Sequence, residues 1–127
     1  MRILLCDDDD CQLHFLESIL VPLDHHVHST SNGDEAWQSY RRFGPWDWLI
    51  SDFLFGEGET IKNGLYLVKA VRKLNPQQNI IVQSSEKSLP LPFGVKFLHK
   101  PYLAKTLLHM MRMPVRPLLP LSFDQEV

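Results

Sequence analysis

Short apolar runs alternate with amphipathic segments along most of this chain. The apolar runs lie between turns that contain glycine or proline, which is typical of buried β-strands. Between them, apolar residues recur every three or four positions, which predicts amphipathic helices. This alternation favours a parallel sheet with helices on both faces. We expect the strands at residues 2–6, 25–30, 48–53, 79–83 and 95–98.

One connection departs from this pattern. Between the fourth and fifth strands, Pro90 and Pro92 prevent a complete helix, because proline lacks a backbone N–H and clashes with the preceding turn. The fourth helix is therefore expected to be shortened or missing. A last helix is expected over residues 102–113. Residues 1–113 would then form one domain, and residues 114–127 a proline-rich tail or linker.

Composition excludes several function classes. The chain has 127 residues, 44% of them hydrophobic, which suffices for one globular domain with its own core. A formal net charge of −2 does not favour binding to the negatively charged backbone of nucleic acid. No apolar run is long enough to cross a bilayer. The first apolar run ends at once in aspartates, unlike a signal peptide, so we expect a cytoplasmic location. Cys6 and Cys11 are expected to be reduced packing residues, because reactive thiolates need positive neighbours.

The third predicted strand ends in a carboxylate, Asp52. An unpaired charge is costly to bury, so Asp52 should lie at the carboxyl edge of the sheet, open to solvent and near a cation. The first strand also ends in acids, Asp7 and Asp8. Parallel strands that end in acids at the same edge would form an oxygen-rich pocket, which suits a hard cation such as Mg²⁺.

Two more polar residues follow predicted strands, Ser84 after the fourth and Lys100 after the fifth. The functional crevice of a parallel sheet lies at the carboxyl ends of its strands, so both should meet the aspartates. Beside a cation, Asp52 could act as a nucleophile toward a phosphoryl group whose oxygens the hydroxyl and the ammonium would bind. Each residue alone also has a simpler explanation, the acids as helix caps and the others as turn residues.

The motifs at these strand ends resemble those of the receiver domain of two-component response regulators. The resemblance extends over residues 2–113 and depends on four segments together: 3–8 (ILLCDD), 49–52 (LISD), 80–85 (IIVQSS) and 97–102 (FLHKPY). It implies a flavodoxin-like, doubly wound sheet of five parallel strands in the order 2-1-3-4-5.

The resemblance also implies a role for each matched residue. Asp52 would accept a phosphoryl group from a phosphohistidine, on a sensor histidine kinase or a phosphotransfer protein. Magnesium would be bound by the acidic residues and one backbone carbonyl, and the phosphoryl group by a lysine that precedes a cis-proline. The residues with these further roles are Asp7, Asp8, Asp52 and Leu54 (carbonyl) for the metal, Lys100 with Pro101 for the phosphate, and Ser84 and Phe97 for switching.

Signalling by such a domain would be a population shift. Phosphorylation would draw Ser84 toward Asp52, Phe97 would rotate into the space vacated, and a protein-interaction face would change its preference. The protein would not be a turnover enzyme, although it could slowly lose its phosphoryl group. Output would require a partner or an effector domain outside this chain. Apolar residues of the tail could also pack on a second copy, namely Leu118, Leu119 and Leu121.

Two departures from the family pattern leave an alternative open. The loop after Asp52 has no proline and carries extra residues before Gly64, and the fourth-helix region is short. Both favour an atypical receiver that acts as a phosphate-independent interaction module. A Mg²⁺-dependent phosphohydrolase is a third hypothesis, but it needs a general acid or base near Asp52, and Phe53 and Leu54 offer none.

Overall fold

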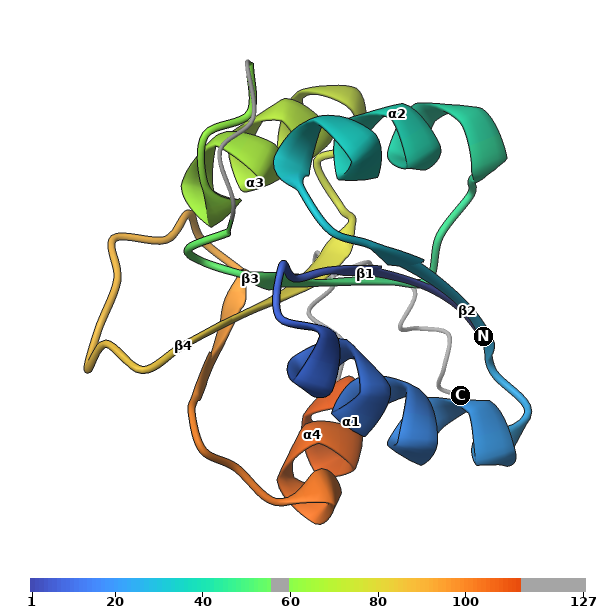
Figure 1. Ribbon diagram of the computed structural model, residues 1–127. Coiled ribbons are helices and arrows are strands. Elements are labelled where there is room, and N and C mark those ends of the chain that lie inside the picture. The colour runs from blue at the N-terminus through green and yellow to red at the C-terminus, as the bar shows by residue number, and fades with distance from the viewer. Residues whose placement is uncertain (56–59, 113–127) are drawn as a thin grey trace, which may run out of the picture.

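Helices cover both faces of a parallel sheet in the computed structural model, which describes residues 1–55 and 60–112 (Figure 1). The five strands lie in the order β2-β1-β3-β4-β5. This confirms the flavodoxin-like order, and each strand agrees with its predicted range to within one residue. The strands are β1 (Arg2–Cys6), β2 (His26–Thr30), β3 (Trp48–Asp52), β4 (Asn79–Ser84) and β5 (Lys96–His99).

The helices form two layers. One layer lies over one face of the sheet and consists of α1 (Asp10–Leu20) and α4 (Ala104–Met111), while α2 (Gly33–Phe43) and α3 (Gly64–Leu74) cover the opposite face (Figure 1). A single 3₁₀ turn, Val21–Leu23, follows α1. The first three helices each begin after a side chain that accepts a backbone N–H of the first turn, which stabilises the helix start. These capping residues are Asp9, Asn32 and Asn63.

The core is divided by the sheet into two apolar layers. Successive residues of a strand point to opposite faces. On β1, Ile3 and Leu5 therefore pack with the α1 and α4 layer, whereas Leu4 packs with the α2 and α3 layer. All three side chains are fully buried. The central strands are buried on both faces, which explains why their sequences are nearly continuous apolar runs.

Packing of α4 on the sheet can be tested with two leucines of the same region. Leu107 is fully buried, whereas 63% of Leu103 is exposed. We expect Leu107→Ala to lower the free energy of unfolding by about 2–5 kcal/mol, because it leaves a cavity. Leu103→Ala should change it by less than about 0.5 kcal/mol. Urea denaturation of both variants measures the difference, and equal effects would contradict this placement of α4.

No helix forms between β4 and β5, where the structure describes every residue. The prediction that the fourth helix is shortened or missing is confirmed. Instead, Leu89, Leu91 and Val95 pack against the apolar layer under α2 and α3. Phe93, in contrast, is 92% exposed. The chain turns at Gly94, whose φ of 84° lies in the left-handed region that favours glycine.

Residues 60 and 61, which precede α3, are fixed to the start of α2. The Asp34 carboxylate accepts the backbone N–H of Ile61 at 2.8 Å. Ile61 is buried, and its carbonyl oxygen would lie 2.7 Å from a Cβ atom placed on Gly33. The far end of the loop is therefore tied to α2 through close backbone contacts.

Among the described residues, no helix combines the length and the apolar character needed to span a bilayer. The tail, including the leucines expected to contact a second copy, lies outside the described residues. Its role and the boundary at residue 113 therefore stay predictions.

Candidate functional site

The acidic run after β1 divides into two parts with different surroundings. Asp9 caps α1 by accepting the backbone N–H of Cys11 at 2.9 Å, and Asp10 is the first residue of that helix. The capping explanation therefore holds for Asp9, and the charge of Asp10 in the first turn suits the positive end of the helix dipole. Asp7 accepts the backbone N–H of Asp9 at 2.9 Å, which turns its carboxylate to the sheet edge.

The two cysteines that flank this run are both free thiols. Cys6 is buried, and burial raises the pKa of its thiol to about 12. The Cys6 thiol is therefore protonated at neutral pH, as expected of a packing residue.

Three carboxylates converge at the carboxyl edge of the sheet. Asp7, Asp8 and Asp52 each place one oxygen within 4.8 Å of the other two. Asp7 is fully buried and Asp52 nearly so, while Asp8 is exposed to solvent. Burial raises the pKa of Asp7 to about 6 and also raises the pKa of Asp52. Carboxylate oxygens are the ligands that hard divalent cations prefer, so the donor set fits a metal such as Mg²⁺.

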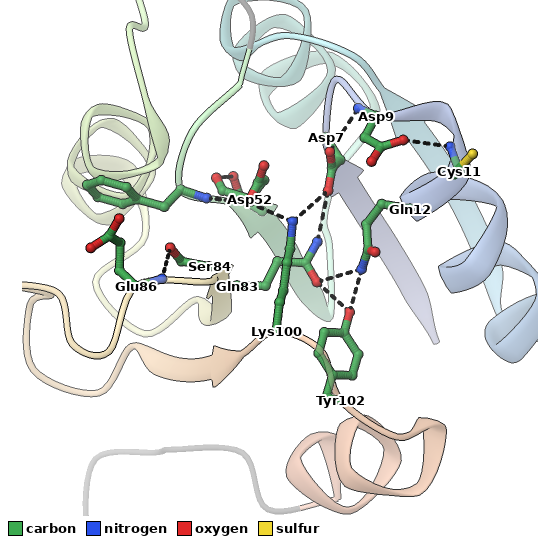
Figure 2. Close-up of polar contacts among 12 residues, drawn as sticks. Asp7, Asp9, Cys11, Gln12, Asp52, Gln83, Ser84, Glu86, Lys100 and Tyr102 are labelled. Atoms are coloured by element: carbon green, nitrogen blue, oxygen red, sulfur yellow. Dashed lines mark hydrogen bonds and ion pairs between the residues drawn. The ribbon is translucent and has the colours of Figure 1, made fainter.

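Lys100 supplies the positive charge of this cluster. Its Nζ donates to Asp52 Oδ1 at 3.1 Å and lies 3.7 Å from Asp7 Oδ2 (Figure 2). Its backbone N–H donates to the Ser84 carbonyl at 2.8 Å, and its peptide bond to Pro101 is cis. The opposite charge counteracts the effect of burial and helps to keep the pKa of Asp52 from rising further.

The remaining predicted residues lie around this cluster without a described contact to Asp52. Ser84 is buried at the end of β4, and its hydroxyl accepts the backbone N–H of Glu86 at 3.0 Å. Phe97 is half-buried on β5, with its ring edge-on to that of His99. The side chain of Leu54 is exposed. The structure thus brings the three acids and the lysine together, with the Ser84 carbonyl bonded to the Lys100 N–H. The roles of the Ser84 hydroxyl, Phe97 and the Leu54 carbonyl stay predictions.

A polar network beside Asp7 was not predicted from the sequence. Gln83, on β4, donates from Nε2 to Asp7 Oδ2 at 3.2 Å. Its Oε1 accepts from Gln12 Nε2 at 3.2 Å and from the Tyr102 hydroxyl (Figure 2). Gln12 also donates to the Tyr102 oxygen at 3.0 Å. One signal was present in the sequence, because Gln83 is a polar residue that directly follows the apolar residues 80–82 of a buried strand.

Gly64, at the start of α3, lies directly against the backbone of Asp52 and Phe53. Its backbone N–H donates to the Phe53 carbonyl at 2.7 Å. A Cβ atom at this position would lie 2.6 Å from the Asp52 carbonyl oxygen and 2.9 Å from Phe53 Cα. The start of α3 therefore approaches the end of β3 so closely that only glycine fits without a shift of the backbone.

Taken together, the edge combines a nearly buried carboxylate, two acids that can share a cation with it, and an ammonium in contact with it. An anionic group could approach Asp52 only where positive charge offsets the three carboxylates, and Lys100 and a bound cation would provide that charge. The geometry thus suits phosphoryl chemistry at a carboxylate better than general acid–base chemistry.

Comparison with known proteins gives a consistent result. No protein-family model matches the chain. Over 87 residues the chain is 32% identical to the DNA-binding transcriptional regulator NtrC of Azospirillum brasilense, which covers 68% of this chain. The matched stretch spans only 17% of the length of that regulator.

Solved structures resemble the chain over most of its length. The receiver domain of the hybrid histidine kinase CckA has a TM-score of 0.73 and 26% identity, covering 88% of this chain and 96% of its own. The receiver domain of the sensor histidine kinase PA1611 from Pseudomonas aeruginosa has a TM-score of 0.76 and 20% identity, covering 87% and 93%, and holds a magnesium ion in its active-site cleft. The chemotaxis protein CheY4 of Vibrio cholerae has a TM-score of 0.73 and 22% identity, covering 87% and 95%.

The three solved structures share the fold of this chain, and two of them are receiver domains, the family that the strand-end motifs indicate. The chain therefore belongs to the receiver domains of two-component response regulators.

Proposed function

We propose that Asp52 is a phosphoacceptor whose modification switches a protein-interaction face. The observation that carries this proposal is the contact of 3.1 Å between Lys100 Nζ and Asp52 Oδ1 inside a cluster of three carboxylates. A lysine in a structural ion pair needs only one partner. Here the ammonium lies between Asp52 and Asp7, where it could also bind an incoming phosphoryl oxygen.

The proposed donor is a phosphohistidine on a sensor histidine kinase or a phosphotransfer protein. An Asp52 carboxylate oxygen attacks the phosphorus, the new O–P bond forms as the P–N bond breaks, and the imidazole leaves with the electron pair. Lys100 pairs with the phosphoryl oxygens and so holds the group in line. Mg²⁺, bound by Asp8, Asp52 and the Leu54 carbonyl with Asp7 alongside, would neutralise the negative charge that gathers there.

The switch that we propose depends on Ser84 and Phe97. The Ser84 hydroxyl accepts from the Glu86 N–H in this structure and can still donate its own proton to a phosphoryl oxygen. Because Glu86 is bonded to this hydroxyl, a movement of Ser84 toward the phosphoryl group would also move the start of the segment between β4 and β5. Phe97, half-buried on the neighbouring strand, would fill the space left behind. The output partner or effector domain would read this change. The domain would act as a switch and not as a turnover enzyme.

The test is the intact mass of the protein after incubation with acetyl phosphate and Mg²⁺. We expect the wild type to gain the mass of one phosphoryl group, and to gain none in EDTA or when Asp52 is replaced by asparagine. The matched control is Asp10→Asn, because Asp10 lies in the same acidic region but begins α1. An adduct on the Asp52→Asn variant would place the acceptor elsewhere.

The lack of a helix between β4 and β5 favours a second candidate, a phosphate-independent interaction module. In that case the wild type would gain no adduct, and Mg²⁺ with beryllofluoride would leave its melting temperature unchanged. Both results together would overturn the phosphoacceptor proposal.

A further inference from the structure

We propose that Gln83 is a positioning residue for Asp7, and that Gln12 and Tyr102 fix the orientation of its amide. The inference rests on the proposed magnesium site and names residues outside the expected ligand set. It starts from burial. Gln83 is fully buried, and leaving a buried amide unsatisfied costs folding free energy. A glutamine at this position therefore needs partners, and all of its described ones belong to this edge of the sheet.

The alternation of side chains along the strand sets the direction of Gln83. Ile81 packs with the α1 and α4 layer, and a residue two positions later on a strand faces the same side. Gln83 therefore extends toward the space between α1 and the start of α4, where Gln12 and Tyr102 lie (Figure 2). Packing alone does not require a polar side chain at a buried strand position, so the glutamine calls for a further explanation.

The hydrogen bonds leave the Gln83 amide with one satisfactory orientation. The Tyr102 hydroxyl and Gln12 Nε2 both donate to Gln83 Oε1. Because Gln12 Nε2 donates to the Tyr102 oxygen as well, the tyrosine proton is directed to Gln83. Turning the amide over would place its NH₂ group against these donors. Nε2 is thus held toward Asp7, and each bond of the chain polarises the next.

This arrangement orients the Asp7 carboxylate from two sides. Oδ1 accepts from the Asp9 N–H at 2.9 Å, and Oδ2 accepts from Gln83 at 3.2 Å. Residues that orient the acids of a metal site from outside the ligand set commonly change metal affinity when they are replaced. We therefore assign to Gln83 the task of fixing the Asp7 carboxylate beside the cation that Asp8 and Asp52 would bind. Gln12 and Tyr102 act through the glutamine.

The experiment measures Mg²⁺ affinity by calorimetric titration, with the rise in melting temperature as a second readout. Gln83→Met keeps the side-chain length but cannot donate, and we expect it to weaken Mg²⁺ binding about 10-fold. Tyr102→Phe removes only a distant hydroxyl and should weaken binding about threefold, the loss of one weak neutral hydrogen bond. The control is Tyr66→Phe, at an exposed tyrosine on α3, which should bind as the wild type does.

A role limited to packing would give a different pattern. The rate of phosphorylation by acetyl phosphate is measured across the same Mg²⁺ range, and a positioning role predicts that saturating Mg²⁺ restores most of the wild-type rate in Gln83→Met. Wild-type Mg²⁺ affinity in both variants, or a rate that stays low at saturating Mg²⁺, would overturn the inference. If the wild type binds Mg²⁺ but accepts no phosphoryl group, the proposed function fails, while the affinities still decide the role of Gln83. If the wild type binds no Mg²⁺, the inference fails as well.

Discussion

Gly64→Ala is expected to destabilise the domain by about 3 kcal/mol, because the added Cβ meets backbone atoms that no side-chain rotation can move away. The nearest of them is the Asp52 carbonyl oxygen, at 2.6 Å. Helix propensity points the other way, since alanine is favoured over glycine within a helix by about 1 kcal/mol. The steric term is the larger, so the net effect should be a loss. A loss of this size lowers the melting temperature by roughly 10 °C or more.

Thermal denaturation of Gly64→Ala and Gly44→Ala provides the comparison. A Cβ at Gly44 would meet its nearest neighbour, the Tyr40 carbonyl oxygen, only at 3.1 Å, so we expect a much smaller change there. The Gly64 variant should also accept phosphate poorly, because the clash displaces the backbone that carries Asp52. A melting temperature at or above that of the wild type would show that helix propensity outweighs the steric term.

Asp7→Asn is expected to have the opposite effect on stability when no divalent cation is present. The pKa of Asp7 is raised from 3.8 to about 6, chiefly by burial, so the folded protein favours the protonated acid. A shift of about two units corresponds to about 3 kcal/mol against the ionised form. Asparagine removes that term. It also gives up one hydrogen bond, from Gln83 or Asp9, worth about 1 kcal/mol, so the net gain should be about 2 kcal/mol at pH 7.5.

The stability difference between Asp7→Asn and the wild type should depend on pH. Because the folded-state pKa of Asp7 lies above the unfolded value, this residue makes the wild type less stable as pH rises from about 4 to about 6, and the deficit is complete above pH 6. The difference between Asp7→Asn and the wild type should therefore vanish near pH 4 and reach its maximum above pH 6. Urea denaturation in EDTA at several pH values measures it. An equal difference at pH 4 and pH 7.5 would assign the gain to something other than ionisation.

The fold could be predicted because its signals are local. Proline at positions 90 and 92 forbids a helix wherever the segment lies, and Asn32 and Asn63 mark helix starts through bonds to their own first turns. The meeting of Asp7, Asp8, Asp52 and Lys100 follows from the topology alone, since strand ends of a parallel sheet share one edge.

The network around Gln83 depends on contacts between residues far apart in the chain. Gln83 lies 71 positions from Gln12 and 19 from Tyr102. No spacing rule links a glutamine on the first turns of α1 to one on β4, and the tyrosine after Lys100 and Pro101 is equally compatible with apolar packing. Such a network becomes visible only when the side-chain directions of three elements are known.

The structure of the segment between β4 and β5 affects the free energy that a conformational switch at this site would require. A helix resists deformation because many backbone bonds along it must break together. Residues 85–95 are held instead by a few apolar anchors, isolated turns and single side-chain hydrogen bonds, such as the one from Arg72 to the Phe93 carbonyl. Reshaping them requires the release of few contacts. On the proposed function, the surface next to Ser84 would therefore change at a low free-energy cost, so a modest bias from phosphorylation of Asp52 would produce a large shift in population.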